Sequence, residues 1–284
     1  MTPTSSIPRV LSIAGTDPSG GAGIQADLKS IGANGGYGMA VVTALVAQNT
    51  CGVRAIHLPP VEFLAQQLDA VSDDVAIDAV KIGMLFDARV VAVVGEWLQR
   101  VRPPIVVLDP VMVAASGDRL LHEDAEAAVR DLLGVVDLVT PNIPELAVLL
   151  GEAPATAWDE VLDQARRLSG RHGVIVLAKG GHLDSHEAPD ALVDGEAITE
   201  YKTERIDTPH THGTGCSLSA AVATLRARLG SWEPAAEQAK AWLTESIAAA
   251  DELKVGTGKG PVSHFAGLWM RGGVDPRPAE QLLR

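Results

Sequence analysis

The sequence has few of the residues that stabilise small secreted proteins or anchor proteins in membranes. Only two of its 284 residues, Cys51 and Cys216, are cysteines, which excludes a disulfide framework. No apolar run approaches the roughly 18 residues of a membrane-spanning helix, and no basic stretch followed by an apolar core opens the chain. We therefore expect a soluble, cytoplasmic protein.

Positive charge is also scarce. Only 23 Lys and Arg residues stand against 36 Asp and Glu residues, which leaves a formal net charge of -13. A field of this sign repels phosphodiester backbones and anionic lipids, so we expect neither nucleic acid nor a membrane as a partner. A small anionic ligand remains compatible with this charge, because it needs only a few local donors.

Aromatic residues make up 4% of the chain, but apolar residues together reach 46%, which is an ordinary globular balance. A chain of this length can bury one large core. No linker or composition shift divides it, and no repeat of fixed period occurs. We therefore expect one domain over residues 1–284, with a folded body at about 9–268 and polar tails at both ends.

Short apolar runs alternate with amphipathic segments through most of the chain. We predict buried strands at residues 9–13, 41–46, 77–82, 105–108, 138–140 and 174–178. Helices are predicted at residues 24–34, 61–71, 90–101, 123–133, 144–150 and 159–168. Continuous apolar strands separated by helices are typical of a parallel sheet covered on both faces, so the predicted fold class is α/β.

The pattern changes after residue 178. Runs at 191–193 and 197–202 flank Asp194-Gly195, a dipeptide favoured in two-residue hairpin turns. This spacing predicts a small antiparallel edge to the sheet. Two helices, at about 214–229 and 234–253, close the body of the protein.

Several glycine and histidine patterns are incomplete versions of known motifs. Residues 21–26 (GAGIQA) fit a dinucleotide pattern, but Gln48 and Asn49 stand where that motif needs an acidic residue. Residues 15–23 and 258–260 do not complete a phosphate-binding Walker motif. His210, His212 and Cys216 lack a fourth ligand at zinc spacing. These patterns favour neither a nicotinamide cofactor nor a structural metal.

A stronger glycine signal lies at residues 207–216 (DTPHTHGTGC), which lead directly into an apolar-periodic helix. Gly213 and Gly215 have no Cβ, so successive amides can turn toward one point, where the helix dipole adds partial positive charge. Such a loop predicts an anion site formed by Gly213, Thr214 and Gly215. The bare pattern fits equally well a plain helix start capped by Thr214.

Cys216 occupies the first turn of that helix. The dipole and the amides there lower the pKa of a thiol, which is the behaviour of a reactive cysteine. A lone cysteine is more often a buried and inert core residue. From the residues alone, the inert interpretation is therefore favoured.

Polar residues follow three of the predicted strands at the edge where ligands bind in such sheets. Asp109 follows strand 105–108, Asn142 and Glu145 follow strand 138–140, and Lys179 follows strand 174–178. Carboxylate oxygens can hold Mg²⁺ through water, and a lysine can neutralise a transferring phosphoryl group. Each of these residues alone is more often a helix cap or a solvated charge, but their coincidence at successive strand ends predicts a phosphate-transfer site.

Seven segments, in order, closely resemble the hydroxymethylpyrimidine/phosphomethylpyrimidine kinases of thiamine biosynthesis. They are residues 14–27 (AGTDPSGGAGIQAD), 43–50 (TALVAQNT), 81–84 (KIGM), 109–112 (DPVM), 140–142 (TPN), 179–182 (KGGH) and 211–216 (THGTGC). The resemblance covers about residues 9–268. It implies a ribokinase-like three-layer α/β/α fold and ATP-dependent phosphorylation of 4-amino-5-hydroxymethyl-2-methylpyrimidine, then of its monophosphate.

The resemblance also implies residue roles. The pyrimidine is expected near Gly15, Asp27, Val46, Gln48 and Met84. ATP is expected near Asn142, Lys179, Thr214 and Lys240, with Mg²⁺ at Asp109 and Glu145. Catalysis is expected from the loop Gly213 to Cys216 together with Lys179, where Cys216 assists or accepts the substrate proton. The Gln48 amide can accept from the ring amino group and donate to the neighbouring ring nitrogen.

Three alternatives remain at this point. A pyridoxal kinase, or an enzyme that accepts both alcohols, shares the resemblance. A non-catalytic binder of a vitamin precursor is a second alternative, and dinucleotide-dependent redox chemistry is a remote third. A homodimer is expected from the resembling family, and residues 15–23 and 114–120 are candidate moving covers of the site.

Overall fold

The computed structural model describes residues 7–112, 121 and 125–272. Its main sheet has eight strands in the order β10-β9-β8-β7-β6-β5-β1-β2. All neighbours from β2 to β8 pair in parallel, and only β9 and β10 run antiparallel to theirs. The strands are β1 (Arg9–Ala14), β2 (Tyr37–Val42), β5 (Ala79–Ile82), β6 (Val106–Leu108), β7 (Leu138–Val139), β8 (Ile175–Lys179), β9 (Asp190–Asp194) and β10 (Ala197–Tyr201).

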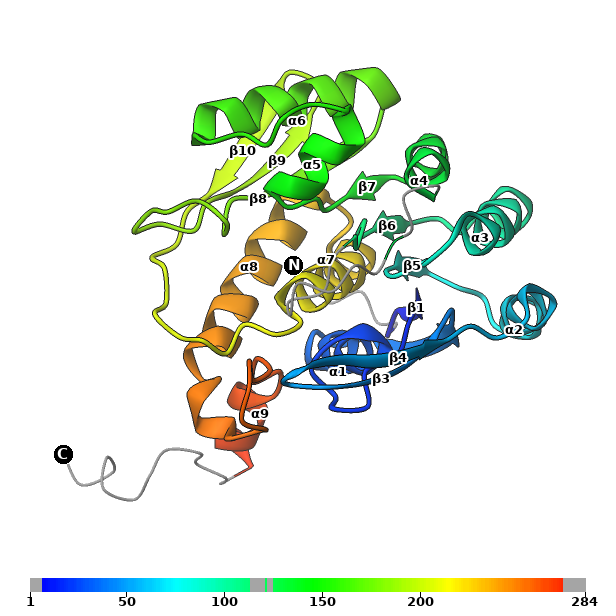
Figure 1. Cartoon of the computed structure of the whole chain (residues 1–284), viewed down its shortest axis with the longest axis horizontal. Helices are drawn as coiled ribbons and strands as arrows, with labels where there is room; N and C mark the ends of the chain where they lie inside the picture. The colour runs from blue at the N-terminus through cyan, green and yellow to red at the C-terminus, as the bar shows by residue number, and fades with distance from the viewer. Residues whose placement is uncertain (1–6, 113–120, 122–124, 273–284) are drawn as a thin grey trace.

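Helices cover both faces of this sheet (Figure 1). One face packs against α1 (Gly23–Ala33), α7 (Thr214–Leu229) and α8 (Trp232–Ala248). The other packs against α2 (Val61–Ser72), α3 (Ala88–Val101), α4 (Glu126–Leu132), α5 (Ile143–Leu150) and α6 (Trp158–His172). A short helix, α9 (Ala266–Arg271), follows α8. The predicted three-layer α/β/α class is confirmed.

The strands are apolar on both faces because each face meets a helix layer. Successive residues of β1 illustrate this: Val10 packs in the core under α7 and α8, and Leu11 packs in the opposite core under α2 and α3. Side chains alternate between the faces along a strand, so a doubly covered strand reads as a continuous apolar run.

The predicted strand at residues 41–46 is wrong as a single element. The chain turns at Thr43, whose hydroxyl donates to the carbonyl of Met84 at 2.6 Å. Residues before the turn form β2 at the sheet edge, and residues after it form β3 (Leu45–Asn49) in a separate sheet. The apolar run hides the break because it contains no Gly or Pro to mark the turn.

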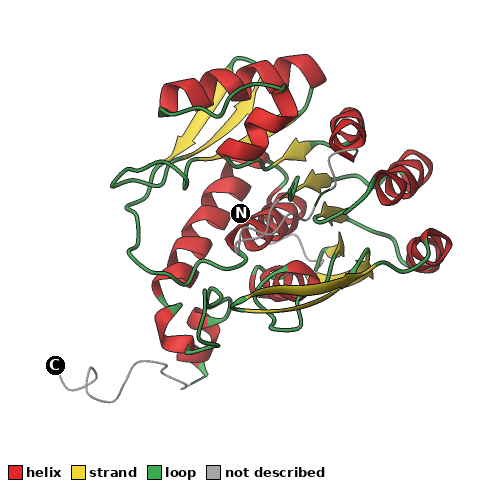
Figure 2. Cartoon of the chain, in the orientation of Figure 1, coloured by secondary structure: helices red, strands yellow, loops and turns green. Residues whose placement is uncertain are grey.

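Strand β3 pairs antiparallel with β4 (Gly52–His57) to form a two-stranded ribbon, which Figure 2 shows projecting along one end of the main sheet. Val46 of the ribbon packs in a small cluster with Ala44 and Met84. The ribbon tip is held by the amide of Lys259, which donates to the carbonyl of Thr50 at 2.9 Å. The ribbon therefore joins the ends of β2 and β5 to the loop after α8.

The predicted antiparallel edge is confirmed. β9 and β10 pair with Asp194 opposite Ala197, and Gly195 of the turn has a φ of 56°, in the left-handed region that favours glycine. The predicted helix 234–253 is too long, because α8 ends at Ala248 and a separate 3₁₀ turn covers Asp251–Leu253. The start of the helix predicted at 123 and the candidate cover 114–120 lie outside the described residues.

Within the described ranges, no helix is both long and apolar enough to cross a membrane. The parallel strands all point their carboxyl ends to the same edge of the main sheet. Loops from these ends, the ribbon β3–β4 and the start of α7 meet there.

Candidate functional site

A cavity of about 830 Å³ opens at the carboxyl ends of the strands. Most of the site residues predicted from the sequence line this cavity: Gly15, Val46, Gln48, Met84, Asp109, Asn142, Glu145, Lys179, Gly213, Thr214, Gly215, Cys216 and Lys240. Residues more than 200 positions apart thus converge on one space. The exception is Asp27.

Helix α7 begins at the cavity wall without a side-chain cap. Its N-cap residue is Gly213, with a φ of 80°. A Cβ at position 213 would lie 1.7 Å from the carbonyl oxygen of Gly21, so only glycine allows the two loops to approach this closely. Without a cap, the first amides of the helix are not satisfied by the helix itself.

These amides lie beside the charged end of the cavity. The amide of Thr214 donates to the carbonyl of Thr211 over 3.3 Å, which leaves the amides of Gly215 and Cys216 as the better anion donors. A Cβ at Gly215 would lie 3.3 Å from the Nζ atom of Lys179 and 3.4 Å from an oxygen of Asp109. The helix start therefore faces the side chains that end β6 and β8.

Lys179 and Asp109 form a buried ion pair at this point. The Lys179 Nζ atom lies 2.9 Å from Oδ1 of Asp109, which also accepts the hydroxyl of Thr140 at 3.0 Å. Burial opposes ionisation of Asp109, but Lys179 and Lys81 outweigh it and hold the pKa of Asp109 below its ordinary value. Burial likewise opposes the charge on Lys179, but Asp109 and Glu145 raise its pKa, so it stays a cation.

Glu145 lies beside this pair, with Oε2 3.9 Å from Lys179. It belongs to a capping box at the start of α5, where Asn142 accepts from the amide of Glu145 and Glu145 accepts from the amide of Asn142. Burial raises the pKa of Glu145 to about 7, with Asp109 adding to the effect and Lys179 opposing it. Glu145 thus caps α5 and also lies close to the anion site.

The described residues contain no cluster of three or more His, Cys, Asp or Glu side chains that holds a metal by itself. Mg²⁺ at a nucleotide site normally needs only one or two carboxylates, because phosphate oxygens and waters supply the other ligands. Asp109 and Glu145 meet that smaller requirement.

The reactive interpretation of Cys216, which needs a lowered thiol pKa, is wrong. Burial raises the pKa of this thiol to about 11, and the opposing effects of Lys81 and of the Gly23 amide do not overcome it. The carboxylates of Asp27 and Asp109 also disfavour a thiolate. Helix position alone suggested a reactive thiolate, but the two nearby carboxylates come from other parts of the chain and are invisible in the local sequence.

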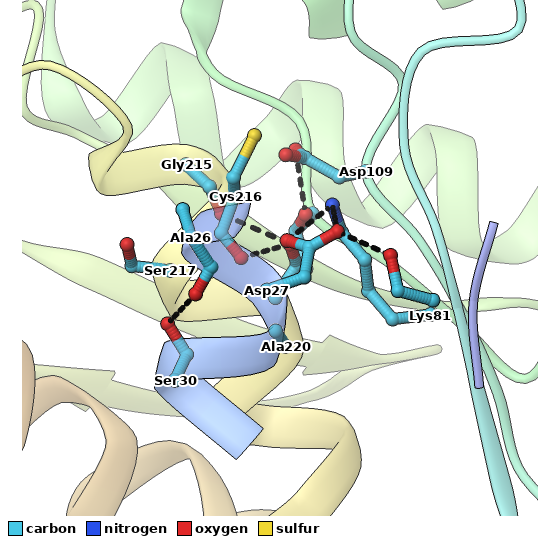
Figure 3. Close-up of polar contacts among 12 residues, drawn as sticks. Ala26, Asp27, Ser30, Lys81, Asp109, Gly215, Cys216, Ser217 and Ala220 are labelled. Atoms are coloured by element: carbon cyan, nitrogen blue, oxygen red, sulfur yellow. Dashed lines mark hydrogen bonds and ion pairs between the residues drawn. The ribbon is translucent and has the colours of Figure 1, made fainter. Parts of the chain in front are cut away.

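Asp27 departs from its expected place beside the pyrimidine. Its side chain is fully buried, and Nζ of Lys81 lies 2.9 Å from both carboxylate oxygens. The hydroxyl of Ser12 donates to it as well, at 2.6 Å. Figure 3 shows this pair beneath the first turn of α7, with Asp109 and Cys216 above it. Asp27 thus supports the floor of the site instead of lining it.

Gln48 projects from β3 at a register irregularity, where the pairing with β4 shifts between Ala47 and Gln48. Such irregularities re-aim side chains, and Gln48 lines the cavity with Val46 of the same strand. Met84 lies opposite, with its sulfur 3.1 Å from where a Cβ of Gly15 would be. Gly15, Val46, Gln48 and Met84 therefore line one part of the cavity, here called the slot, with one amide on its wall.

Lys240 lines the other end of the cavity, but its ammonium group is already engaged. It donates to Oδ2 of Asp190 and to the carbonyl of Ala188, both at 2.8 Å. Asp190 also accepts the amide of Gly180, the residue after Lys179, at 3.3 Å. Lys240 therefore braces the loop that follows β8.

Sequence reasoning missed Asp17, Lys81 and His212 as contributors to the site. Lys81 and Asp27 are paired although 54 residues apart, and Asp17 and His212 although 195 residues apart. All lie in segments that carry the family resemblance. Besides that resemblance, the available signal was a charged side chain in an apolar or glycine-rich stretch.

Comparison with known proteins agrees with this geometry. The family model of phosphomethylpyrimidine kinase matches residues 17–263. The chain belongs to the phosphomethylpyrimidine kinase family. The match spans the cavity wall from the loop at Asp17 to the loop after α8.

Relatives support the same assignment. A hydroxymethylpyrimidine/phosphomethylpyrimidine kinase of Escherichia coli (strain K12) is 52% identical over 260 residues, which cover 91% of this chain and 98% of that protein. A thiamine biosynthesis multifunctional protein of Corynebacterium efficiens is 56% identical over 265 residues. The chain spans 35% of the length of that larger relative.

A solved structure has the same fold. The pyridoxal kinase of Bacillus subtilis, in complex with ADP, superposes with a TM-score of 0.84 and 32% identity, covering 93% of this chain and 99% of that one. Members of the phosphomethylpyrimidine kinase family and pyridoxal kinases thus share this ribokinase-like architecture.

The buried pair of Asp27 and Lys81 predicts a large stability effect. Lys81→Met leaves a buried carboxylate unpaired and should lower the free energy of unfolding by about 3–5 kcal/mol in urea titrations. The double variant Asp27→Leu/Lys81→Met should recover most of this loss. Arg9→Met, which breaks the more exposed pair with Asp78, is the control and should cost at most about 1 kcal/mol. A Lys81→Met cost equal to that of Arg9→Met would contradict the described burial.

The raised pKa of Cys216 predicts slow alkylation. In a Cys51→Ser background at pH 8, iodoacetamide should modify Cys216 about a hundredfold more slowly in the folded protein than in the unfolded chain. The rate should rise tenfold for each pH unit up to about pH 10, because the thiolate fraction rises while the pH stays below a pKa of about 11. A rate that levels off near pH 8 would show that the thiol has its ordinary pKa.

Proposed function

We propose that this protein transfers the γ-phosphoryl group of ATP to 4-amino-5-hydroxymethyl-2-methylpyrimidine, and then transfers a second one to the monophosphate product. The observation that carries the proposal is the meeting of unsatisfied amides at the start of α7 with the Lys179–Asp109 pair in the cavity that Gln48 also lines. The membership of the chain in a kinase family and the ADP complex of its structural neighbour support ATP as the donor.

The proposed mechanism is an in-line displacement. The substrate hydroxymethyl oxygen attacks the γ-phosphorus, and the bond from that phosphorus to the oxygen bridging to the β-phosphate breaks. Because the transition state of such transfers is loose, positioning and charge stabilisation dominate over covalent chemistry. Negative charge on the transferring group is stabilised by the amides of Gly215 and Cys216 and by the ammonium of Lys179. The nucleotide is bordered by Asn142 and Lys240.

Cys216 has a secondary part in this proposal. Its thiol is protonated at neutral pH in the ligand-free protein, so it accepts the substrate proton only after releasing its own proton to solvent. The helix amides need no such proton movement and are already in place. We therefore assign the larger share of the rate to the amides, and a proton-assisting role to Cys216.

Mg²⁺ would be held by Asp109 and Glu145 through water, together with phosphate oxygens of the nucleotide. When bound, it supplies positive charge that offsets the charge of the phosphates. Lys179, which lies between the two carboxylates, keeps them compensated before the nucleotide enters. Lys179 compensates Asp109 directly, and the raised pKa of Glu145, about 7, leaves that side chain only partly ionised at neutral pH.

The pyrimidine is proposed to lie in the slot formed by Gly15, Val46, Gln48 and Met84. One amide on an otherwise apolar wall fits a small flat ring with adjacent donor and acceptor groups. A ring that lacks that edge leaves the Gln48 amide unpaired, which costs binding energy. The slot therefore favours the aminopyrimidine over pyridoxal.

Activity toward pyridoxal is the second candidate, since a pyridoxal kinase superposes closely on this chain. A non-catalytic binder is disfavoured, because it needs neither Lys179 nor the uncapped helix start. We further propose that residues 1–284 form one catalytic domain, that the enzyme is a homodimer, and that it works in the cytoplasm, where ATP is available.

The direct test measures ADP release from Mg-ATP with a panel of hydroxymethyl heterocycles. ADP release should depend on the aminopyrimidine, with monophosphate appearing first and diphosphate afterwards by mass spectrometry. Release should be at least tenfold slower, as kcat/KM, with pyridoxal, because the Gln48 match is lost. A higher kcat/KM for pyridoxal would reassign the substrate, and no acceptor-dependent release would remove the proposed activity.

Gln48→Ala should weaken the pyrimidine step selectively. Losing two ring hydrogen bonds should raise the KM for the aminopyrimidine by roughly 10- to 100-fold, with the KM for ATP within about twofold of wild type. Asn49→Ala is the matched control, because the Asn49 side chain accepts the amide of Cys51 at the ribbon tip. An unchanged KM in Gln48→Ala would remove this residue from the substrate site.

A further inference from the structure

Asp17 is a fully buried carboxylate in the glycine-rich loop before α1, and the proposed chemistry does not use it. Its Oδ1 accepts the amide and the hydroxyl of Ser19, at 2.9 and 2.7 Å. Its Oδ2 accepts the amides of Ala22 at 2.8 Å and Gly21 at 3.1 Å. One side chain thus organises the whole loop from residue 17 to the start of α1.

The same carboxylate reaches across to the loop before α7. Oδ2 of Asp17 lies 2.7 Å from Nε2 of His212. Burial opposes ionisation of Asp17, but hydrogen bonds from His212 and Ser19 outweigh it and lower its pKa to about 2. An ionised carboxylate only accepts, so His212 donates through Nε2–H. Lys29 of α1 also faces this loop, because its Nζ atom donates to the carbonyl of Gly20 at 2.7 Å and interacts electrostatically with Asp17.

His212 is placed to transmit this bond to the anion site. It immediately precedes Gly213, the N-cap of α7, and its amide donates to the carbonyl of Gly260 at 3.1 Å. Position 213 and the carbonyl of Gly21 touch so closely that no side chain fits between them. The loop before α1, the loop before α7 and the loop after α8 are therefore held together at one point.

We propose that Asp17 and His212 are positioning residues that fix the amides of Gly215 and Cys216 at the distance needed for phosphoryl transfer. This inference rests on the proposed kinase activity. The hydrogen bond to Asp17 fixes the position of His212, the residue before the N-cap. It thereby fixes where the first turn of α7 begins. A displacement of about 1 Å in such a donor costs up to a hundredfold in rate.

Two amide variants of His212 differ in reach and so test this role. His212→Gln places an amide Nε2–H near the position of the histidine Nε2 and should keep kcat within about threefold of wild type. His212→Asn is too short to reach Asp17 and should lower kcat roughly 10- to 100-fold. His212 lines the cavity, but its Nε2 atom is occupied by Asp17, so the KM values for ATP and for the aminopyrimidine should stay within about threefold.

Thermal unfolding and activity are measured on the same samples, with Ser72→Ala as the control. Ser72 accepts the indole N–H of Trp97 at 3.2 Å on the opposite face of the sheet, so its loss should lower the Tm and leave kcat unchanged. A wild-type kcat in folded His212→Asn overturns the proposal, and so does an equal fall in His212→Gln and His212→Asn. If His212→Asn does not fold, Asp17→Asn decides in its place, and a wild-type kcat there has the same consequence.

Measurements on the wild-type enzyme distinguish a failure of the proposed function from a failure of the proposed positioning role. Absence of pyrimidine-dependent ADP release by the wild type would remove the proposed function itself. Wild-type release together with an unaffected His212→Asn variant would remove only the positioning role of Asp17 and His212.

Discussion

The site depends on main-chain amides at the start of α7 that the helix leaves unsatisfied. Gly213 provides no cap, and its contact with Gly21 fixes where the helix begins. The amides carry no net charge, so burying them at an anion site costs less desolvation free energy than burying charged side chains would. The contact between Gly213 and Gly21 positions these amides, and Lys179 and Asp109 supply charge close to them. The anion site is thus built by the backbone first and by side chains second.

The net charge of the protein does not describe the charge at the proposed phosphate site. A chain with a formal net charge of -13 nevertheless presents lysines at the place where phosphates are proposed to bind. Lys81, Lys179 and Lys240 are each paired with an aspartate, which is how buried ammonium groups remain charged. The pairs of Lys81 and Lys179 lie below and beside the start of α7, and that of Lys240 lies farther along the cavity.

Much of the fold could be predicted because the strands are buried on both faces. Their continuous apolar runs and the intervening helices read clearly, as does the Asp194-Gly195 hairpin. The turn at Thr43 could not be predicted, since it depends on a hydrogen bond to Met84 from another strand. Strand ends predicted the meeting of Asp109 and Lys179, whereas the burial of Asp27 and the raised pKa of Cys216 come from side chains distant in sequence. Local patterns predict which residues lie at an edge, and they do not predict which charges face one another.

A crystal structure with a non-hydrolysable ATP analogue and the aminopyrimidine tests the central claim most directly. Terminal phosphate oxygens should lie about 2.7–3.1 Å from the amide nitrogens of Gly215 and Cys216, with Lys179 also in contact and the pyrimidine hydroxymethyl group facing the phosphorus. A terminal phosphate bound away from the first turn of α7 would contradict it.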